Sequence, residues 1–424
     1  MIKWYKEYIQ ILEEELVPAM GCTEPIAIAY ASAKAREVLQ EMPVRLVVKC
    51  SGNIIKNAKC VTVPNTGSLV GIEASAIIGV LAGDSSKELE VISKVEPEHI
   101  TKTKQLLETD FCKVELLESL TPLHIQIFAT GLNHTSFVEI KDTHTNIVKI
   151  SVDDEITFEN QVSKDKYLGV LADRSVLSVQ GIYEFANGVK IEDVKEMLDR
   201  QIECNMAIAK EGLKGNYGVG IGKMLMEKYP EQTLLTKMKA YTASASEARM
   251  SGCSLPVVTN SGSGNQGITS SVPIVVYCLE NHLAKEQMYR GLVFSNLMTI
   301  HQKTGIGRLS AFCGAVCAAC ASGTAITYLA GGTLEQICMT IENTLADIPG
   351  IVCDGAKPSC AIKIASSLDA SMMAHYLAMD HHAYNKNDGI LKNTIENTIQ
   401  AVGRIGKQGM KATEHEILEI MLEK

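Results

Sequence analysis

The spacing of apolar residues changes twice along this chain of 424 residues. Helical spacing over the first 40 residues predicts helices at Lys3 to Val17 and Pro25 to Leu39, separated by a turn at 18–22. Short alternating or β-branched runs between about 84 and 155 predict strands around one helix at 99–109. Helical spacing returns from about 160, with polar or glycine-rich loops at 212–220, 251–267 and 350–359.

These changes predict an α+β fold in which a mostly helical domain is interrupted by a small α+β domain. The helical, catalytic domain would comprise residues 1–83 and 156–424, and the small domain residues 84–155. Strands are expected in the small domain at 89–92, 113–116, 124–129, 136–140 and 147–152. Two further β-branched runs, at 45–49 and 60–63, precede it together with a helix at 68–81.

Composition narrows the class of protein. The net charge is −9 and no block of Lys or Arg interrupts the chain, so a nucleic-acid partner is not expected. The N-terminus lacks the apolar stretch of a signal peptide, which favours a cytoplasmic protein. Residues 309–334 carry no charge but consist mainly of small residues, so we expect a closely packed interior helix rather than a membrane span.

The thirteen cysteines are expected to be free thiols and metal ligands rather than disulfides, because the chain is neither small nor rich in loops. Cys353 and Cys360 lie seven residues apart in a run that Gly355 and Pro358 keep from being helical, so both thiols can turn to one point. With Cys313, they would supply three thiolates. Three converging thiolates can hold a cubane iron–sulfur cluster and leave one iron open for substrate.

A second spacing overlaps this one. Cys313, Cys317 and Cys320 match the CxxxCxxC spacing by which radical SAM enzymes hold a cluster, but they fall in an alanine-rich helical run. Positions i and i+7 of a helix are about 10 Å apart, too far for one cubane. Cys317 and Cys320 are therefore expected to be small buried residues.

The run from Gly262 to Gly267 fits GxGxxG after a strand-like segment, yet the second strand and acidic residue of a dinucleotide site do not follow. Two interpretations stay open, a structural loop and an anion-binding turn at a helix N-terminus. The turn would suit a carboxylate. The candidate substrate-binding residues are Ser261, Gly262, Ser263, Gly264, Asn265 and Gly267, with Asn65 and Thr66 before another helix as weaker candidates.

Cys22 lies just before a helix whose first turn carries Pro25. The helix dipole and free N–H groups at that position are expected to lower the pKa of the thiol. A buried capping cysteine is the alternative.

The pentapeptide Gly21–Pro25, residues 260–267, residues 311–315 and residues 351–360 occur in an order that resembles the L-cysteine desulfidase family. That family is related to the α chain of the iron–sulfur L-serine dehydratases. The resemblance covers nearly the whole chain. It implies a [4Fe-4S] cluster held by Cys313, Cys353 and Cys360, with Cys22 as the catalytic thiol.

The activity that the resemblance implies is β-elimination of L-cysteine to pyruvate, ammonia and sulfide without pyridoxal phosphate. L-Serine dehydration at the same site, or a non-catalytic amino-acid-binding protein, are the alternatives. Thiol and hydroxyl substrates differ by one atom, so the sequence leaves the choice between them open. Charge-poor helices are compatible with a homo-oligomer, and a small amino acid is the expected partner.

Overall fold

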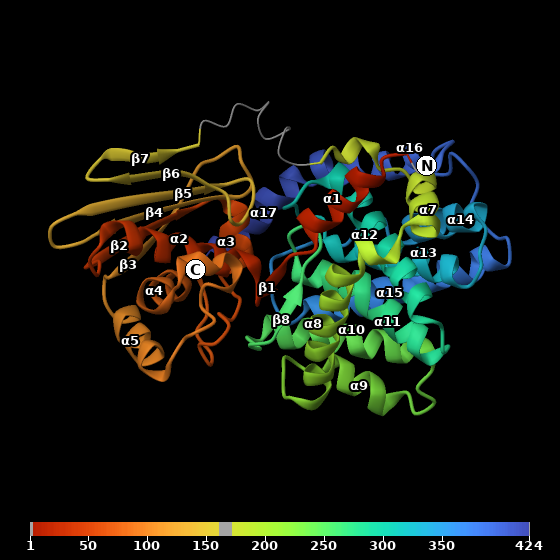
Figure 1. Cartoon of the computed structure of the whole chain (residues 1–424), viewed down its shortest axis with the longest axis horizontal. Coiled ribbons are helices and arrows are strands. Elements are labelled where there is room, and N and C mark those ends of the chain that lie inside the picture. The colour runs from red at the N-terminus through yellow and green to blue at the C-terminus, as the bar shows by residue number, and fades with distance from the viewer. Residues whose placement is uncertain (1–2, 161–171, 424) are drawn as a thin grey trace.

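The computed structural model describes residues 3–160 and 172–423, which form two units side by side (Figure 1). One unit is a sheet covered by helices, and the other is almost entirely helical. The expected mostly helical α+β fold is thus confirmed.

The small unit is built on a six-stranded sheet with the order β3-β2-β4-β5-β6-β7. β2 and β3 are parallel, and all other neighbours are antiparallel. The strands are β2 (Arg45–Cys50), β3 (Cys112–Leu116), β4 (His124–Thr130), β5 (Thr135–Lys141), β6 (Ile147–Val152) and β7 (Glu155–Glu159).

Helices cover one face of this sheet, as Figure 1 shows. They are α2 (Thr23–Leu39), α3 (Gly52–Ala58), α4 (Ile72–Ala82) and α5 (Pro97–Leu107). Alternation along β2 buries Leu46, Val48 and Cys50 against them. α2 and α4 approach closely because residue 79 is glycine, where a Cβ would lie 2.3 Å from the Ala29 carbonyl oxygen.

The expected boundary at residue 84 divides this unit. β2 pairs with β3 and β4, and α2, α3 and α4 share a core with the sheet, so the unit extends back to about residue 23. The strand expected at 89–92 is instead the end of a short 3-10 segment, Ser85–Glu90, and the start of the turn at 91–94. Residues 60–63 contribute one isolated bridge, Thr62 to Val70.

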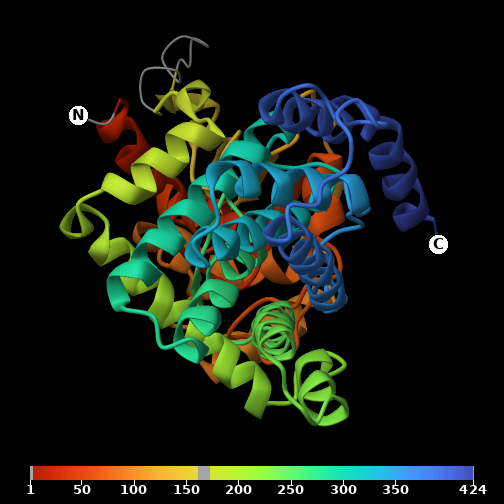
Figure 2. The ribbon, with the colours of Figure 1, turned by 90° about the vertical axis from the view of Figure 1, so that its right-hand side faces the viewer.

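Figure 2 shows the molecule from the right-hand side of Figure 1, with the helical unit nearest the viewer. α13 lies at its centre and packs on α11, α12, α14 and α15, so residues 309–334 do contain a buried interior helix. No helix in the described part of the chain is long and apolar enough to cross a bilayer. The helices are α1 (Tyr5–Glu15), α7 (Val179–Gly188), α8 (Lys195–Lys214), α9 (Ile221–Lys228), α10 (Leu234–Met250), α11 (Gly264–Glu280), α12 (Lys285–Ile306), α13 (Gly314–Leu329), α14 (Leu334–Asp347), α15 (Cys360–Met379), α16 (Ile395–Arg404) and α17 (Lys411–Leu422).

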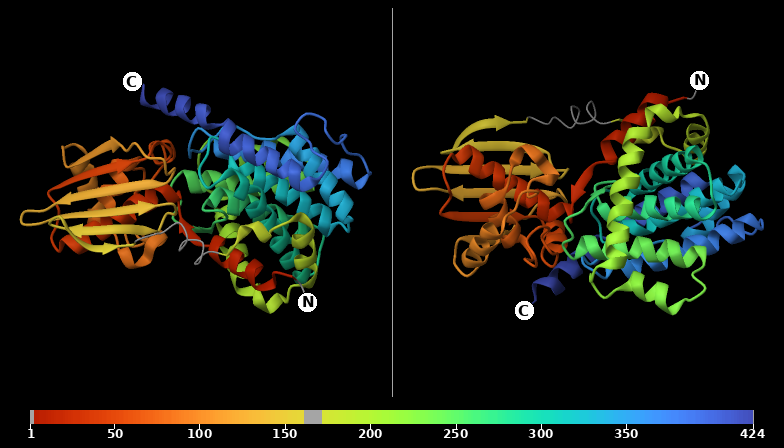
Figure 3. Two further views of the ribbon diagram at one scale, coloured as in Figure 1. Left: turned by 90° about the horizontal axis from the view of Figure 1, so that it is seen from above. Right: turned by 60° about the horizontal axis from the view of Figure 1, so that its bottom comes forward.

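A strand pair and a helix contact are among the connections between the units. The turn expected at 18–22 contains β1 (Pro18–Met20), which pairs with β8 (Pro256–Val258) of the helical unit. α17 extends from the helical unit to α3, as Figure 3 shows from two directions. A Cβ on residue 52 of α3 would lie 2.6 Å from Leu418 Cδ2, so a larger residue there would require the Leu418 side chain to shift.

Candidate active site

A cavity of about 90 Å³ lies where the two units meet. The small unit contributes the start of α2, part of α3 and the turn between β5 and β6. The helical unit contributes the start of α11 and residues around 308–315 and 353–360. Eight predicted site residues line the cavity: Cys22, Ser261, Gly262, Ser263, Asn265, Cys313, Cys353 and Cys360.

The three distant cysteines are brought together by local backbone structure. Residues 312 and 352 form an antiparallel bridge, with the N–H of Cys313 donating to Ile351 at 2.9 Å and that of Cys353 to Ala311 at 2.7 Å. Cys313 caps α13 and Cys360 begins α15, so both thiols stand at positive helix ends. The thiols of Cys313 and Cys353 are within hydrogen-bonding reach of each other.

The three cysteines differ in pKa, because the hydrogen bond to Cys353 and burial raise that of Cys313 well above its usual value. The hydrogen bond from Cys313 lowers the pKa of Cys353 to about 5, although burial opposes the charge, and Lys56 adds to the effect. Burial raises the pKa of the Cys360 thiol. Lys56 and Lys303 are each at most 4% exposed, and burial lowers the pKa of Lys303 while the neighbouring cysteines favour its charge. Two buried cations thus face a cluster of sulfurs.

Three thiol side chains are the type of ligand that an iron–sulfur cluster takes. Among the described residues, no three His, Cys, Asp or Glu side chains converge closely enough to bind one ion. A cubane presents a different iron to each thiolate, so its ligands stand farther apart than those of one ion. Three thiolates also give the assembly negative charge, which the buried lysines can balance.

Cys22 caps α2 as expected, but its pKa is opposite to the expectation. The residue is 2% exposed, and burial raises the pKa of its thiol well above the usual value. The Glu24 carboxylate raises it further by repelling a thiolate, while Arg249 acts in the other direction. Burial and a neighbouring carboxylate therefore outweigh the helix dipole here.

Glu24 is a functional candidate that the sequence reasoning missed, although it lies within the Gly21–Pro25 motif. Its Oε2 accepts hydrogen bonds from the Cys22 thiol at 3.0 Å and the Thr23 hydroxyl at 3.1 Å. Its Oε1 accepts one from Asn57 Nδ2 at 3.0 Å. Burial alone would raise the pKa of Glu24, but His144 and the bond from Cys22 hold it well below its usual value.

The turn before α11 brings the glycine-rich run to the cavity. Ser261 and Gly262 both have positive φ, 51° and 76°, and Thr23 donates to the Gly262 carbonyl at 3.1 Å. Asn265 accepts a hydrogen bond from Ser246 at 3.0 Å, which fixes its side chain at the first turn of α11. The N–H groups of that turn have no intrahelical acceptors, so the arrangement suits an anion.

Four predicted substrate-binding residues lie outside the cavity lining. Gly267 is in close contact with the β8 backbone, where a Cβ would be 2.0 Å from the Val258 oxygen. At Gly264 the Arg249 side chain occupies the space that a Cβ would need. Asn65 and Thr66 bind backbone oxygens of Ile92 and Val63, at 3.0 and 2.6 Å, and stabilise their own loop.

Two further cavity residues had no signal in the sequence. His144 comes from the turn between β5 and β6, is 5% exposed, and lies 3.8 Å from Glu24, too far for a hydrogen bond. Its Nε2 has no hydrogen-bond partner among the described residues. Arg249, at the end of α10, is 2% exposed. Neither residue belongs to a recognisable motif, and only the fold brings them to Cys22.

The other motifs have structural explanations. Cys317 and Cys320 are buried in the core around α13, as expected, and are not part of the cavity lining. The glycine-rich loop at 215–223 wraps the buried Glu247 carboxylate, which accepts hydrogen bonds from the N–H groups of residues 219, 220 and 221 at 2.7–3.0 Å. An internal carboxylate occupies the position that a phosphate would take.

Comparison with known proteins identifies the family. The model of the serine dehydratase alpha chain matches residues 86–419. A UPF0597 protein of Lachnoclostridium phytofermentans is 51% identical over 99% of this chain and 100% of its own length. Another, from Treponema denticola, is 47% identical over 99% of this chain and 98% of its own. The chain therefore belongs to the serine dehydratase alpha chain family.

Proposed function

We propose that this protein is an iron–sulfur-dependent lyase that removes the β-substituent of L-cysteine, giving pyruvate, ammonia and sulfide. Family membership supports a lyase-type enzyme. The observation that carries the finer proposal is the shared cavity, in which three cysteines distant in sequence meet Cys22 and the turn before α11.

Cys313, Cys353 and Cys360 would hold a [4Fe-4S] cluster. When bound, such a cluster supplies an open iron as a Lewis acid that assists departure of the thiol. The charge of Lys56 favours the thiolate of Cys353, and Cys353 and Cys313 in turn favour the charge of Lys303. Because both lysines are buried, water screens that charge poorly.

Cys22 would take the Cα proton of the substrate. Because its thiol is protonated at rest, it must first lose a proton, and Glu24 accepts its hydrogen bond at 3.0 Å. Release of that proton to solvent leaves a thiolate, a step that Arg249 favours by its charge and Glu24 opposes. The thiolate becomes a thiol again on taking the Cα proton. Loss of sulfide gives aminoacrylate, which tautomerises and is hydrolysed to pyruvate and ammonia.

The turn before α11 would hold the substrate carboxylate. Ser261, Ser263 and Asn265 offer polar side chains at the cavity, and Gly262 lines it with backbone. Gly264 and Gly267 contribute by letting α11 begin close to Arg249 and β8.

Anaerobic reconstitution with iron and sulfide, followed by an assay of pyruvate from L-cysteine, tests the proposal. Cys353→Ser is expected to lose both the brown colour and turnover. Cys22→Ala should keep the colour and lose at least 100-fold in kcat, in the range of a removed general base. Cys60→Ser, at an exposed cysteine, is the control and should retain both. Full activity in Cys22→Ala would exclude it as the base.

L-Serine dehydration is the second candidate, favoured by the name of the matching family. It uses the same residues, with hydroxide in place of sulfide as the departing group. Pyruvate formation from equal concentrations of the two amino acids, compared as kcat/KM, distinguishes these reactions. Binding of amino acids without any pyruvate from the reconstituted protein would favour a binding protein instead.

A further inference from the structure

Arg249 is a buried cation at the cavity whose charge has no partner. Within the part of the chain that the structure describes, no carboxylate pairs with it, and its Nε has no hydrogen-bond partner. Its Nη1 reaches only the Met250 sulfur, at 4.0 Å. A guanidinium that is 2% exposed therefore faces the cavity without an ion-pair partner among the described residues.

Such an arrangement is costly in a folded protein. Removing an ion from water carries a large desolvation penalty, which a partner of opposite charge normally offsets. The nearby Glu24 carboxylate is already engaged, because it accepts hydrogen bonds from Cys22, Thr23 and Asn57. The missing partner of Arg249 is thus expected to be an anion that enters the cavity.

The surroundings of Arg249 favour the same kind of ligand. A Cβ on residue 264 would lie 2.2 Å from Arg249 Nε, so the guanidinium lies directly against the first residue of α11. The free N–H groups and dipole of this 17-residue helix attract negative charge at that end. A planar carboxylate could accept hydrogen bonds from both groups at once.

We propose that Arg249, together with the N-terminus of α11, binds the α-carboxylate of the substrate. This inference rests on the proposed function, in which the substrate is an α-amino acid. Both Arg249 and Glu24 act on the Cys22 thiol. Arg249 and Cys22 also line the same cavity, so a carboxylate bound at Arg249 would bring the adjoining Cα toward the proposed base.

Binding of L-alanine and ethylamine to the cluster-free full-length protein tests the inference, because the two ligands differ only by a carboxylate. Calorimetry is expected to detect L-alanine but not ethylamine with the wild-type protein. Arg249→Met should weaken L-alanine binding about ten- to a hundredfold, as loss of hydrogen bonds to a charged group predicts. The L-alanine affinity of Arg249→Lys should lie between those of the wild type and Arg249→Met, because lysine keeps the charge but not the planar guanidinium.

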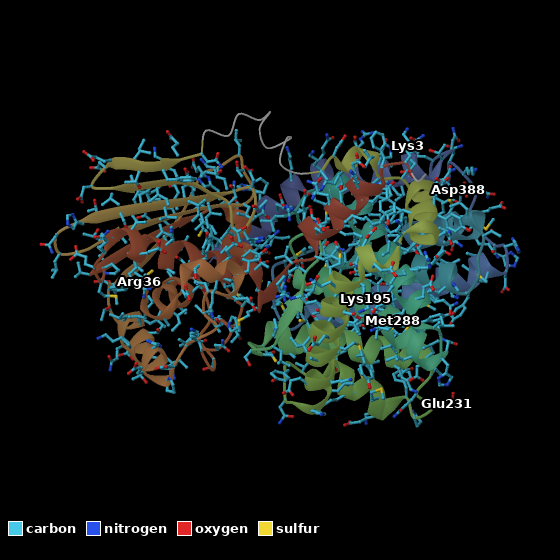
Figure 4. The ribbon with its side chains drawn as sticks, viewed as in Figure 1. Lys3, Arg36, Lys195, Glu231, Met288 and Asp388 are labelled. Atoms are coloured by element: carbon cyan, nitrogen blue, oxygen red, sulfur yellow. The ribbon has the colours of Figure 1, made fainter. Side chains whose placement is uncertain are left out.

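Thermal unfolding without ligand separates this interpretation from a structural one. Arg249→Met should melt at the same temperature as the wild type or higher, since it removes an uncompensated buried charge. Arg36→Met is the matched control. Arg36 lies in the small unit (Figure 4) and binds the carbonyls of Val80 and Gly83, so its loss should lower the melting temperature without changing L-alanine affinity.

Equal affinity of the wild type and Arg249→Met for L-alanine would overturn the inference, as would a wild-type protein that does not bind L-alanine. The outcome is independent of turnover. If the reconstituted protein makes no pyruvate, the proposed function fails, while Arg249-dependent binding of L-alanine would still support a carboxylate site.

Discussion

Single side chains at the start of α11 set the geometry of the cavity. Gly264 leaves the space that Arg249 fills, with a Cβ position 2.2 Å from Nε and 2.6 Å from Cζ. We predict that Gly264→Ala displaces the guanidinium, raising KM at least tenfold and destabilising the fold by about 1–3 kcal/mol, the usual cost of overpacking. Steady-state kinetics and urea unfolding measure the two effects.

Gly409→Ala is the control for this change. A Cβ there would have only Ile405 Cγ2 nearby, at 3.8 Å, an ordinary contact. The control should leave KM unchanged. An unchanged KM in Gly264→Ala as well would mean that the position of Arg249 does not affect substrate binding.

The sequence revealed the site residues that belong to a local motif and missed those that do not. Cys22, Cys313, Cys353 and Cys360 stand in recognisable runs, and all four line the cavity. His144 and Arg249 lie in ordinary strand-turn and helix sequence, so only the folded chain places them at the cavity. The low pKa expected for Cys22 was wrong because it considered the helix end without the burial and Glu24.

Among the elements, those with local signals were predicted well. The runs expected at 113–116, 124–129, 136–140 and 147–152 correspond to β3, β4, β5 and β6. The pairing of β2 with β3 was missed, because about sixty residues separate two strands that become parallel neighbours. Local periodicity contains no information on which distant strands pair. The expected domain boundary at residue 84 consequently divided one sheet.

The face of β4 and β5 carries a buried charge cluster that should make the small unit sensitive to acid. Glu139 accepts hydrogen bonds from His124 at 2.7 Å and Gln126 at 2.8 Å, and pairs with Lys141 at 2.9 Å. Burial opposes its charge, but these partners lower the pKa of Glu139 from 4.5 to about 2. A depressed folded-state pKa stabilises the protein above pH 4.5, and that contribution is lost as pH falls toward 2.

We therefore predict that Glu139→Gln lowers the free energy of unfolding at pH 7 by about 2–3 kcal/mol. The difference from wild type should shrink as pH falls from 4.5 toward 2, since the wild-type carboxylate becomes protonated. Urea unfolding at pH 7 and pH 3 measures it. Glu155→Gln, at an exposed position of β7, should change stability little at either pH. If wild type and Glu139→Gln differed by the same unfolding free energy at both pH values, the lowered pKa of Glu139 would not be the cause of the difference.

At the scale of the whole molecule, the cavity depends on both units. Cys22, Glu24 and His144 come from the chain around the sheet, and Arg249 and the three clustered cysteines from the helical unit. β1–β8 pairing and the contact of α17 with α3 fix one unit against the other. A polar side chain of the small unit that faces this shared cavity is therefore placed to act on a ligand bound there.

His144 is that side chain, and its replacement tests whether the small unit contributes to turnover. Its Nε2 has no hydrogen-bond partner among the described residues but lies 3.8 Å from the Glu24 carboxylate, so His144→Leu removes a charge neighbour of Glu24 and should lower the free energy of unfolding by about 1–3 kcal/mol. We predict at least a tenfold loss of kcat/KM in the reconstituted enzyme, because the imidazole lines the cavity beside Glu24. His134→Leu, at an exposed histidine of the same unit, should keep wild-type kcat/KM. Wild-type turnover in His144→Leu would restrict the contribution of the small unit to Cys22 and Glu24.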